Sequence, residues 1–396
     1  MAISVPEVNL TTELLLEEPW APLGLVPPGT EVVRSPRGLE VLTYEACAAV
    51  LRDTNLGCGL PELFLASGVT DERPVKVASE SVNNAEGERH VRLRMAMGSF
   101  FVPARVEAVR GQVRRMIDEL LDKAERPEGF DLADEVIKHI PSKLFALLLG
   151  VDESESDFIG RISEETVAVF SMDPEKEEAV RQAYQEEDAW VEALLARPGA
   201  AEGDNLVAHL LAQQDAGKLD AEEVHNAVVT LLAASVDTTQ TLAGLMMWAF
   251  IENPDQWELL RSDMSLIPGA VREASRWRSG TPWIFRIALT DTEVRGVPVS
   301  AGEPIFALVG SANRDPRTFQ DPDRFDITRK DVPGALNWSV GRHFCLGRMF
   351  SVMEMEELLR ATATRYSRLR HADPDAAAQA PYLSPMKSLP VIADAV

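Results

Sequence analysis

The sequence is poor in cysteine and in positive charge. Its three cysteines, Cys47, Cys58 and Cys345, are odd in number and widely spaced in 396 residues, which argues against a disulfide framework or a zinc cluster. Lysine and arginine total 39 against 63 aspartates and glutamates, so the formal net charge is −24. This surplus of negative charge argues against nucleic acid and anionic membrane surfaces as partners.

Several organisational signals are also missing. We find no apolar run of transmembrane length, and the acidic N-terminal residues lack the basic and apolar regions of a signal sequence. No internal repeat or low-complexity linker divides the chain. With 45% hydrophobic residues the chain can bury a large core. A mainly helical chain of this length can form one domain or two, and we expect it in the reducing cytoplasm and not on a membrane.

The spacing of apolar residues predicts a mainly α-helical protein with a smaller β-rich part. Short β-like runs occur at 31–34 and 39–43, a mainly helical pattern covers about 88–278, and a strand-rich patch follows at 284–306. One helix is expected to be unusually long. Asp220 and Glu223 have capping-box spacing, and the pattern ends only at Pro254, after about 33 residues or roughly 50 Å. Its middle is apolar on nearly all sides and should be buried.

Cys345 lies between two glycines, Gly341 and Gly347, and opens a helical stretch. A helix N-terminus presents free N–H groups and a positive dipole end, which stabilise a thiolate. Glycines at these positions leave room for a flat ligand, and the neighbouring Arg342 and His343 add basic groups. The loop thus predicts a thiolate facing a large, flat, partly anionic ligand; a buried free cysteine beside a turn is the alternative.

The stretch 338–347, Trp-Ser-Val-Gly-Arg-His-Phe-Cys-Leu-Gly, resembles the haem-binding loop of the cytochrome P450 family, Phe-x-x-Gly-x-x-x-Cys-x-Gly. The resemblance implies that Cys345 binds haem iron as a thiolate and that Gly347 contacts the haem. Trp338 replaces the usual phenylalanine. Its indole N–H could reach the sulfur or merely pack.

Asp237 lies in the middle of the long helix, where an unpaired carboxylate is costly to bury. Ala234-Ser235-x-Asp237-Thr238-Thr239 resembles the oxygen-binding groove of the same family, Ala/Gly-Gly-x-Asp/Glu-Thr-Thr. The resemblance implies that Ala234 borders the haem and that Asp237 and Thr238 deliver protons to bound oxygen. The structural alternative is that the threonines bond back to helix carbonyls and Asp237 meets an arginine.

The resemblance also assigns basic and network residues. His90 and Arg94, four apart, together with Arg286 and His343 would bind the haem propionates. Each could otherwise be a surface charge.

Glu273 and Arg276 lie three apart on one helix face and can pair, although such a pair is usually a weak surface feature. By resemblance they form a buried structural network, with Arg324 as its third member, that holds the segment before the cysteine loop.

The resemblance implies a single cytochrome P450 domain over residues 1–396, with haem b between the long central helix and the cysteine-bearing helix. The implied activity is that of a haem-thiolate monooxygenase, which inserts one oxygen atom from O2 into a lipophilic or aromatic small molecule of natural-product metabolism. Ferredoxin and ferredoxin reductase would supply electrons, docking on arginines bunched at 89–94, 105–115 and 342–348. The alternatives are a peroxide-using haem-thiolate enzyme and a haem-binding protein without turnover; the acid–alcohol pair disfavours both.

Candidate substrate contacts are mainly apolar, and each is more often a core residue than a pocket residue. They are Phe64, Phe170, Trp283, Ile284 and Leu383.

Overall fold

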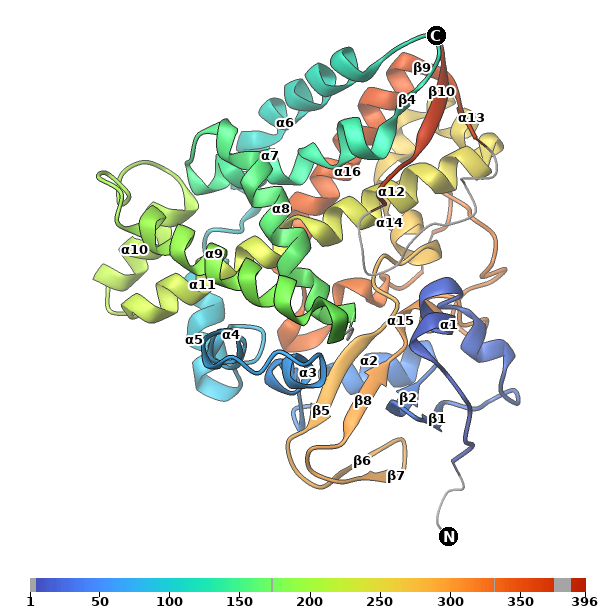
Figure 1. Ribbon diagram of the computed structural model, residues 1–396. Coiled ribbons are helices and arrows are strands. Elements are labelled where there is room, and N and C mark those ends of the chain that lie inside the picture. The colour runs from blue at the N-terminus through green and yellow to red at the C-terminus, as the bar shows by residue number, and fades with distance from the viewer. Residues whose placement is uncertain (1–4, 172–173, 331, 374–385) are drawn as a thin grey trace.

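The computed structural model describes residues 5–171, 174–330, 332–373 and 386–396. Helices dominate, as predicted, and a small β-rich part lies to one side (Figure 1). The α-helices are α1 Thr12–Glu17, α2 Tyr44–Arg52, α3 Leu60–Ala66, α4 Glu72–Glu80, α5 Gly87–Gly98, α6 Pro103–Ala124, α7 His139–Leu149, α8 Ser156–Val167, α9 Glu177–Leu195, α10 Leu206–Asp215, α11 Ala221–Ser235, α12 Asp237–Glu252, α13 Pro254–Ser262, α14 Ile267–Trp277, α15 Val309–Ala312 and α16 Arg348–Arg365.

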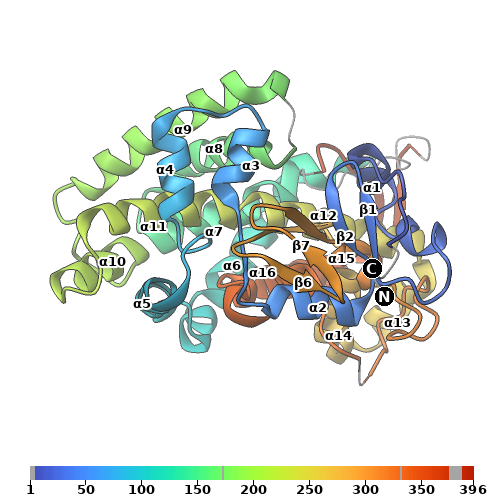
Figure 2. The same cartoon turned by 90° about the horizontal axis from the view of Figure 1, so that it is seen from below.

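The strands form three sheets. They are β1 Val32–Ser35, β2 Gly38–Val41, β3 Leu56–Gly57, β4 Phe130–Asp131, β5 Ile284–Ala288, β6 Thr292–Val294, β7 Val297–Val299, β8 Pro304–Ala307, β9 Tyr366–His371 and β10 Pro390–Ala395. The largest sheet has the order β1-β2-β8-β5-β3, in which only β2 and β8 pair in parallel. In Figure 2 this sheet lies with α1 and α2 in one half of the molecule, and α4 and α8–α11 lie in the other half.

The predicted long helix crosses the middle of the molecule as α11 and α12 (Figure 1). The capping box is present: the Asp220 side chain accepts from the Glu223 backbone N–H, and the Glu223 side chain accepts in return. The helix is not continuous, however, because its regular pattern breaks at Val236. The hydroxyl of Ser235 donates to the Leu231 carbonyl, and that of Thr238 donates to the Ala234 carbonyl at 3.1 Å. Such bonds compete with the helix ladder and bend helices.

Two expectations about this helix need correction. Residues 221–252 are long and apolar enough to cross a membrane, although 72% of the most apolar window is buried inside the protein, as in a core helix. Its middle is also not buried on every side. Ala234 and Thr238 are exposed, and both face the cavities described below.

The helix after the cysteine loop, α16, is fixed on several sides. It belongs to the largest hydrophobic cluster, together with α6, α7, α12 and α14. Glu357 of α16 is buried and accepts hydrogen bonds from two arginines of α6, Arg110 at 2.9 Å and Arg114 at 2.7 Å. This packing gives the cysteine loop a rigid support.

The predicted pair of α14 is present and buried. Arg276 donates to both carboxylate oxygens of Glu273, at 2.8 and 2.7 Å. The third cation is Arg329, whose Nε donates to Glu273 Oε1 at 3.0 Å. The prediction that the Arg324 side chain completes this network is wrong. That side chain is exposed, and only the Arg324 carbonyl takes part, accepting from Arg276 and Arg329 at 3.1 and 2.9 Å.

Candidate active site

The cysteine loop folds back on itself before α16 begins. The backbone N–H of Cys345 donates to the Trp338 carbonyl at 2.9 Å. The helix starts at Arg348, three residues later than predicted, with Gly347 as its N-cap residue. Burial raises the pKa of the Cys345 thiol, while hydrogen bonds from the backbone N–H groups of Gly347 and Arg348 oppose this shift. As expected, the N-terminus of α16 therefore directs backbone N–H groups at the Cys345 sulfur.

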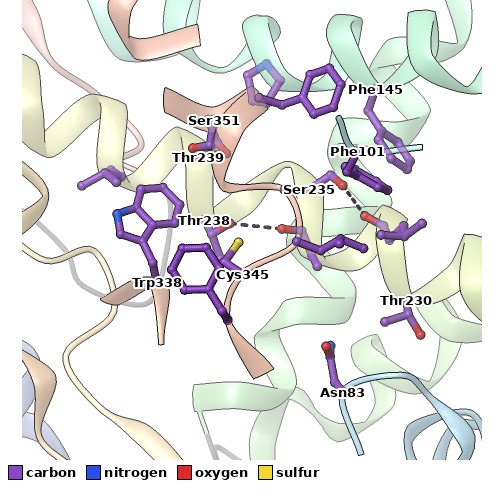
Figure 3. Close-up of a pocket in the computed structure, with 18 of the residues that line it drawn as sticks. Asn83, Phe101, Phe145, Thr230, Ser235, Thr238, Thr239, Trp338, Cys345 and Ser351 are labelled. Atoms are coloured by element: carbon purple, nitrogen blue, oxygen red, sulfur yellow. Dashed lines mark hydrogen bonds between the residues drawn. The ribbon is translucent and has the colours of Figure 1, made fainter. Parts of the chain in front are cut away.

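The two glycines of the loop serve different purposes. Gly341 has φ of +79°, which favours glycine, and a Cβ there would lie 3.3 Å from the Arg52 Cα. A Cβ on Gly347 would meet no atom within 4 Å, so this position opens onto a cavity. Trp338 lines the same cavity next to Cys345 (Figure 3). Its indole forms no hydrogen bond with the sulfur and stays as packing.

Two adjoining cavities share part of their walls, and Cys345 lines one of them. The first, here called the cysteine cavity, has a volume of about 290 Å³ and is lined by Cys345 and Gly347. The second, the helix cavity, has a volume of about 330 Å³ and lies along α11, α12 and β5. The residues that line both cavities are Asn83, Thr230, Ala234, Thr238, Gly280, Thr281 and His343.

The acid–alcohol pair lies at this junction. Thr238 lines both cavities, and Asp237 lines the helix cavity with only 4% of its surface exposed. Burial raises the pKa of Asp237 to about 7, and the nearby Glu164 adds to the shift. Within the described chain no arginine pairs with this carboxyl group. The structural alternative is thus half right: Thr238 does bond back to Ala234, but the carboxyl has no cation.

The four predicted propionate ligands come together from three parts of the chain. The rings of His90 and His343 lie 4.5 Å apart, between centroids. Arg94 and His343 line the cysteine cavity, and Arg286 and His343 line the helix cavity. Burial, and then the positive charge of Arg286, lowers the pKa of His343 to about 4. The Nε2 atom of His90 is buried and has no hydrogen-bond partner among the residues that the structure describes. Arg94, Arg286 and His343 thus surround the unpaired His90 nitrogen with basic groups, an arrangement that suits an anionic ligand such as a carboxylate.

The comparisons with known proteins agree with this geometry. A sequence model of the family described as Cytochrome P450 matches residues 175–374. Luteothin monooxygenase of Streptomyces thioluteus is 33% identical over 339 residues, covering 84% of this chain and 83% of that protein. The chain belongs to the cytochrome P450 family. The 6-deoxyerythronolide B hydroxylase of Saccharopolyspora erythraea is 34% identical over 340 residues, with 83% of each protein covered.

The fold of this P450 matches solved structures over nearly its whole length. The crystal structure of CalO2 superposes with a TM-score of 0.88 at 24% identity, covering 97% of this chain and 98% of that one. Relatives of this P450 are named as monooxygenases and hydroxylases, and the protein is accordingly a P450 oxidoreductase. P450 enzymes carry haem on a cysteine thiolate. Three features of the site fit haem. There is open space next to Gly347, the Cys345 sulfur receives backbone hydrogen bonds, and the His90 Nε2 atom is unpaired among the described residues.

Four of the five candidate substrate contacts of this P450 line the helix cavity: Phe64, Phe170, Trp283 and Ile284. The fifth, Leu383, lies outside the described residues. The cavity wall is mainly apolar and aromatic.

The sequence interpretation missed several lining residues of this P450. Thr230 lies four residues before Ala234, so helical spacing alone could have identified it. Glu354 of α16 lines the cysteine cavity, and burial raises its pKa well above the usual range. Asn83 and Tyr184 line the helix cavity, but they belong to distant segments and no local signal marks them.

The expected basic face of this P450 is largely neutralised by its own acids. Arginines of all three predicted groups form ion pairs within the chain rather than presenting free charge. The pairs are Arg89 and Arg92 with Glu223, Arg105 with Asp204, Arg110 and Arg114 with Glu357, and Arg342 with Glu86.

Proposed function

We propose that this P450 is a cytoplasmic, single-domain monooxygenase that inserts one oxygen atom of O2 into a lipophilic or aromatic small molecule of bacterial secondary metabolism. One observation carries the proposal: Thr238 and Cys345 line the same cavity, and the helix cavity that Thr238 also borders is mainly apolar. The relatives named as luteothin monooxygenase and 6-deoxyerythronolide B hydroxylase support the reaction class.

The cofactor is proposed to be haem b, with Cys345 as the axial ligand. His90, Arg94, Arg286 and His343 would hold the propionates. Ala234 and Gly347, which line the cysteine cavity with Cys345, would contact the haem. When bound, the haem supplies the site at which O2 is held and activated, and the thiolate donates electron density that favours cleavage of the O–O bond.

The protein's own contribution is to move protons and exclude water. The Thr238 hydroxyl donates to the Ala234 carbonyl at 3.1 Å, and its lone pairs can accept a hydrogen bond from a water molecule in the cavity and so hold that water in place for proton transfer. Asp237, with a pKa raised to about 7 by its burial, can both release and recover a proton near neutral pH. The apolar wall around them limits the substrate to molecules that need little hydration.

Electrons are proposed to come from ferredoxin and ferredoxin reductase, with docking around α5 and the cysteine loop. Val91 and Met95, one helical turn apart on α5, are 55% and 71% exposed. Phe344, 39% exposed, is joined to this helix because Arg94 donates to its carbonyl. Grouped apolar side chains on a surface are typical of a protein contact. Because most nearby arginines are already paired, the contact should depend only moderately on salt.

The first test is spectroscopic and uses two cysteines that line the joined cavities. The reduced, CO-treated protein should show the strongly red-shifted Soret band of a thiolate-ligated haem. Cys345→Ala should abolish this band, whereas Cys58→Ala, which changes a cysteine of the helix cavity, should keep it. A band that survives in Cys345→Ala would overturn the ligand assignment.

The second test concerns turnover on a ligand chosen by its effect on the Soret band. Thr238→Ala should lower product formed per O2 consumed and raise peroxide release, while Thr238→Ser, which keeps the hydroxyl, should restore coupling. The peroxide-using alternative would be favoured if peroxide alone gave product at the rate seen with ferredoxin and ferredoxin reductase, and if Thr238→Ala did not change that rate. Haem binding without turnover under either condition would favour the binding protein.

A further inference from the structure

Five of the ten hydroxyl groups that line the two cavities already donate to an acceptor of the protein. These five can still accept a hydrogen bond from a ligand, but they have no proton left to donate to one. The committed donors are Ser81 to the Ala78 carbonyl at 2.9 Å, Ser235 to the Leu231 carbonyl, Thr238 to the Ala234 carbonyl at 3.1 Å, Thr239 to Ser351 Oγ at 3.0 Å and Thr241 to the Asp237 carbonyl at 2.9 Å.

Asn83 and Thr230 differ from this set. Both line both cavities, and neither side chain has a hydrogen-bond partner within the described parts of the chain. Figure 3 shows the Asn83 amide directed into the pocket, with Thr230 on the same side. A hydrogen bond of 3.1 Å from Asn226 to Glu80 joins α11 to the end of α4. Asn226 lies one turn before Thr230, and Glu80 lies three residues before Asn83, so this bond holds the two segments together.

The surroundings make an unpaired amide and hydroxyl costly once a ligand displaces water. Val77, Ala78, Val229 and Ala233 line the same part of the helix cavity. Leaving a buried donor or acceptor without a partner costs about 1–3 kcal/mol. A ligand that fits here must therefore offer a polar group to this pair or bind less tightly.

We propose, on the basis of the function proposed above, that Asn83 and Thr230 together hold one neutral oxygen of an otherwise apolar substrate. The amide and the hydroxyl can each donate and accept, so a hydroxyl or carbonyl oxygen fits both. Thr230 and Thr238 are eight residues apart along α11 and α12, or about 12 Å at 1.5 Å per residue. The pair thus anchors the substrate oxygen about two helical turns from Thr238, where O2 is proposed to bind. This distance determines which carbon of the substrate reacts.

The test uses ligands whose reach can be varied. Two matched series are titrated into the holoenzyme, 1-alkylimidazoles and 1-(ω-hydroxyalkyl)imidazoles, with chains from propyl to decyl. The imidazole nitrogen binds the haem iron and shifts the Soret band, which gives a Kd without turnover. At most lengths the terminal hydroxyl should weaken binding to the apolar cavity. At one intermediate length it should tighten binding about fivefold, as one neutral hydrogen bond does.

Asn83→Leu and Thr230→Val should each remove this gain. The Kd of the plain alkyl series should stay unchanged for chains too short to reach the pair and should fall for chains that cover it, because each variant leaves one unpaired polar group fewer. Thr281→Val is the matched control. Thr281 also lines both cavities, and its side chain has no partner in the described chain. It belongs to a different segment from Asn83 and Thr230, because the preceding Gly280 lies against Thr241 of α12. A gain that is absent at every length, survives both variants, or disappears equally in Thr281→Val would overturn the proposal. Because no electron donor is used, failure here is distinct from failure of the proposed monooxygenase activity.

Discussion

Replacing Arg329 with alanine should destabilise this P450, whereas the same change at Arg324 should not. The Arg329 side chain is only 11% exposed and donates to Glu273 Oε1 at 3.0 Å. It also donates to the carbonyls of Gln320 and Asp321, the latter at 2.6 Å, and so closes the turn that precedes the cysteine loop. The Arg324 side chain is exposed and, among the described residues, pairs with no side chain of this network.

The expected size of the effect follows from what each change leaves unpaired. Leaving a buried charge with no partner lowers the free energy of unfolding by about 3–5 kcal/mol. Glu273 would keep both bonds from Arg276, so it would be only partly stranded. The carbonyls of Gln320 and Asp321 belong to surface residues and can be rehydrated. We therefore expect Arg329→Ala to cost about 2–3 kcal/mol, within the range for hydrogen bonds to charged groups. Arg324→Ala should fall within about 0.5 kcal/mol of the wild type.

The assay is urea-induced unfolding of the purified holoenzyme, followed by far-UV circular dichroism under conditions in which refolding restores the signal. Arg329→Lys is an informative third variant. Lysine keeps the charge but has three N–H donors for the four groups that Arg329 serves, the Glu273 carboxylate and the carbonyls of Gln320, Asp321 and Arg324. This variant should lose an intermediate amount of stability. If Arg324→Ala lost as much as Arg329→Ala, the network as described would be refuted.

Two further predictions concern the active site. The pKa of Asp237 is about 7 in the fold, above about 3.9 in an unfolded chain, so the folded state holds this proton more tightly. The contribution of Asp237 to the stability of the wild type should therefore be lost as pH rises from about 4 to about 7. Asp237→Asn should make the pH slope of the unfolding free energy more positive than in the wild type over this range, and an unchanged slope would contradict the prediction. Trp338→Phe should leave the haem reduction potential unchanged, because the bond from the Cys345 N–H to the backbone carbonyl at 338 survives. A lower potential in a redox titration would show that the indole donates to the sulfur.

Local motifs made much of this P450 predictable. The capping box of Asp220 and Glu223 joins residues three apart, and the Glu273–Arg276 pair has the same spacing. The loop around Cys345 is likewise decided within ten residues, including the positive φ at Gly341. In each case the interacting groups are close in sequence, so residue type and spacing fix the contact with little influence from the rest of the fold.

Other features escaped prediction because they depend on groups far apart in the chain. The basic face appeared free in the sequence, yet Arg92 and Glu223 are separated by 131 positions and pair across the fold. Helical spacing could have identified Thr230 from Ala234, but nothing local shows that Asn83 lies at the same cavity.

The sequence by itself therefore determined the helical class and the family, and it located the loop around Cys345 and the Asp237–Thr238 pair. Only the tertiary structure decided that Arg329 rather than Arg324 meets Glu273, that the central helix breaks at Val236, and that Asp237 is buried without a cation. The physical reason is range. Spacing along the chain governs contacts within a turn or loop, whereas burial, desolvation and pairing across the core depend on which distant segments the fold brings together.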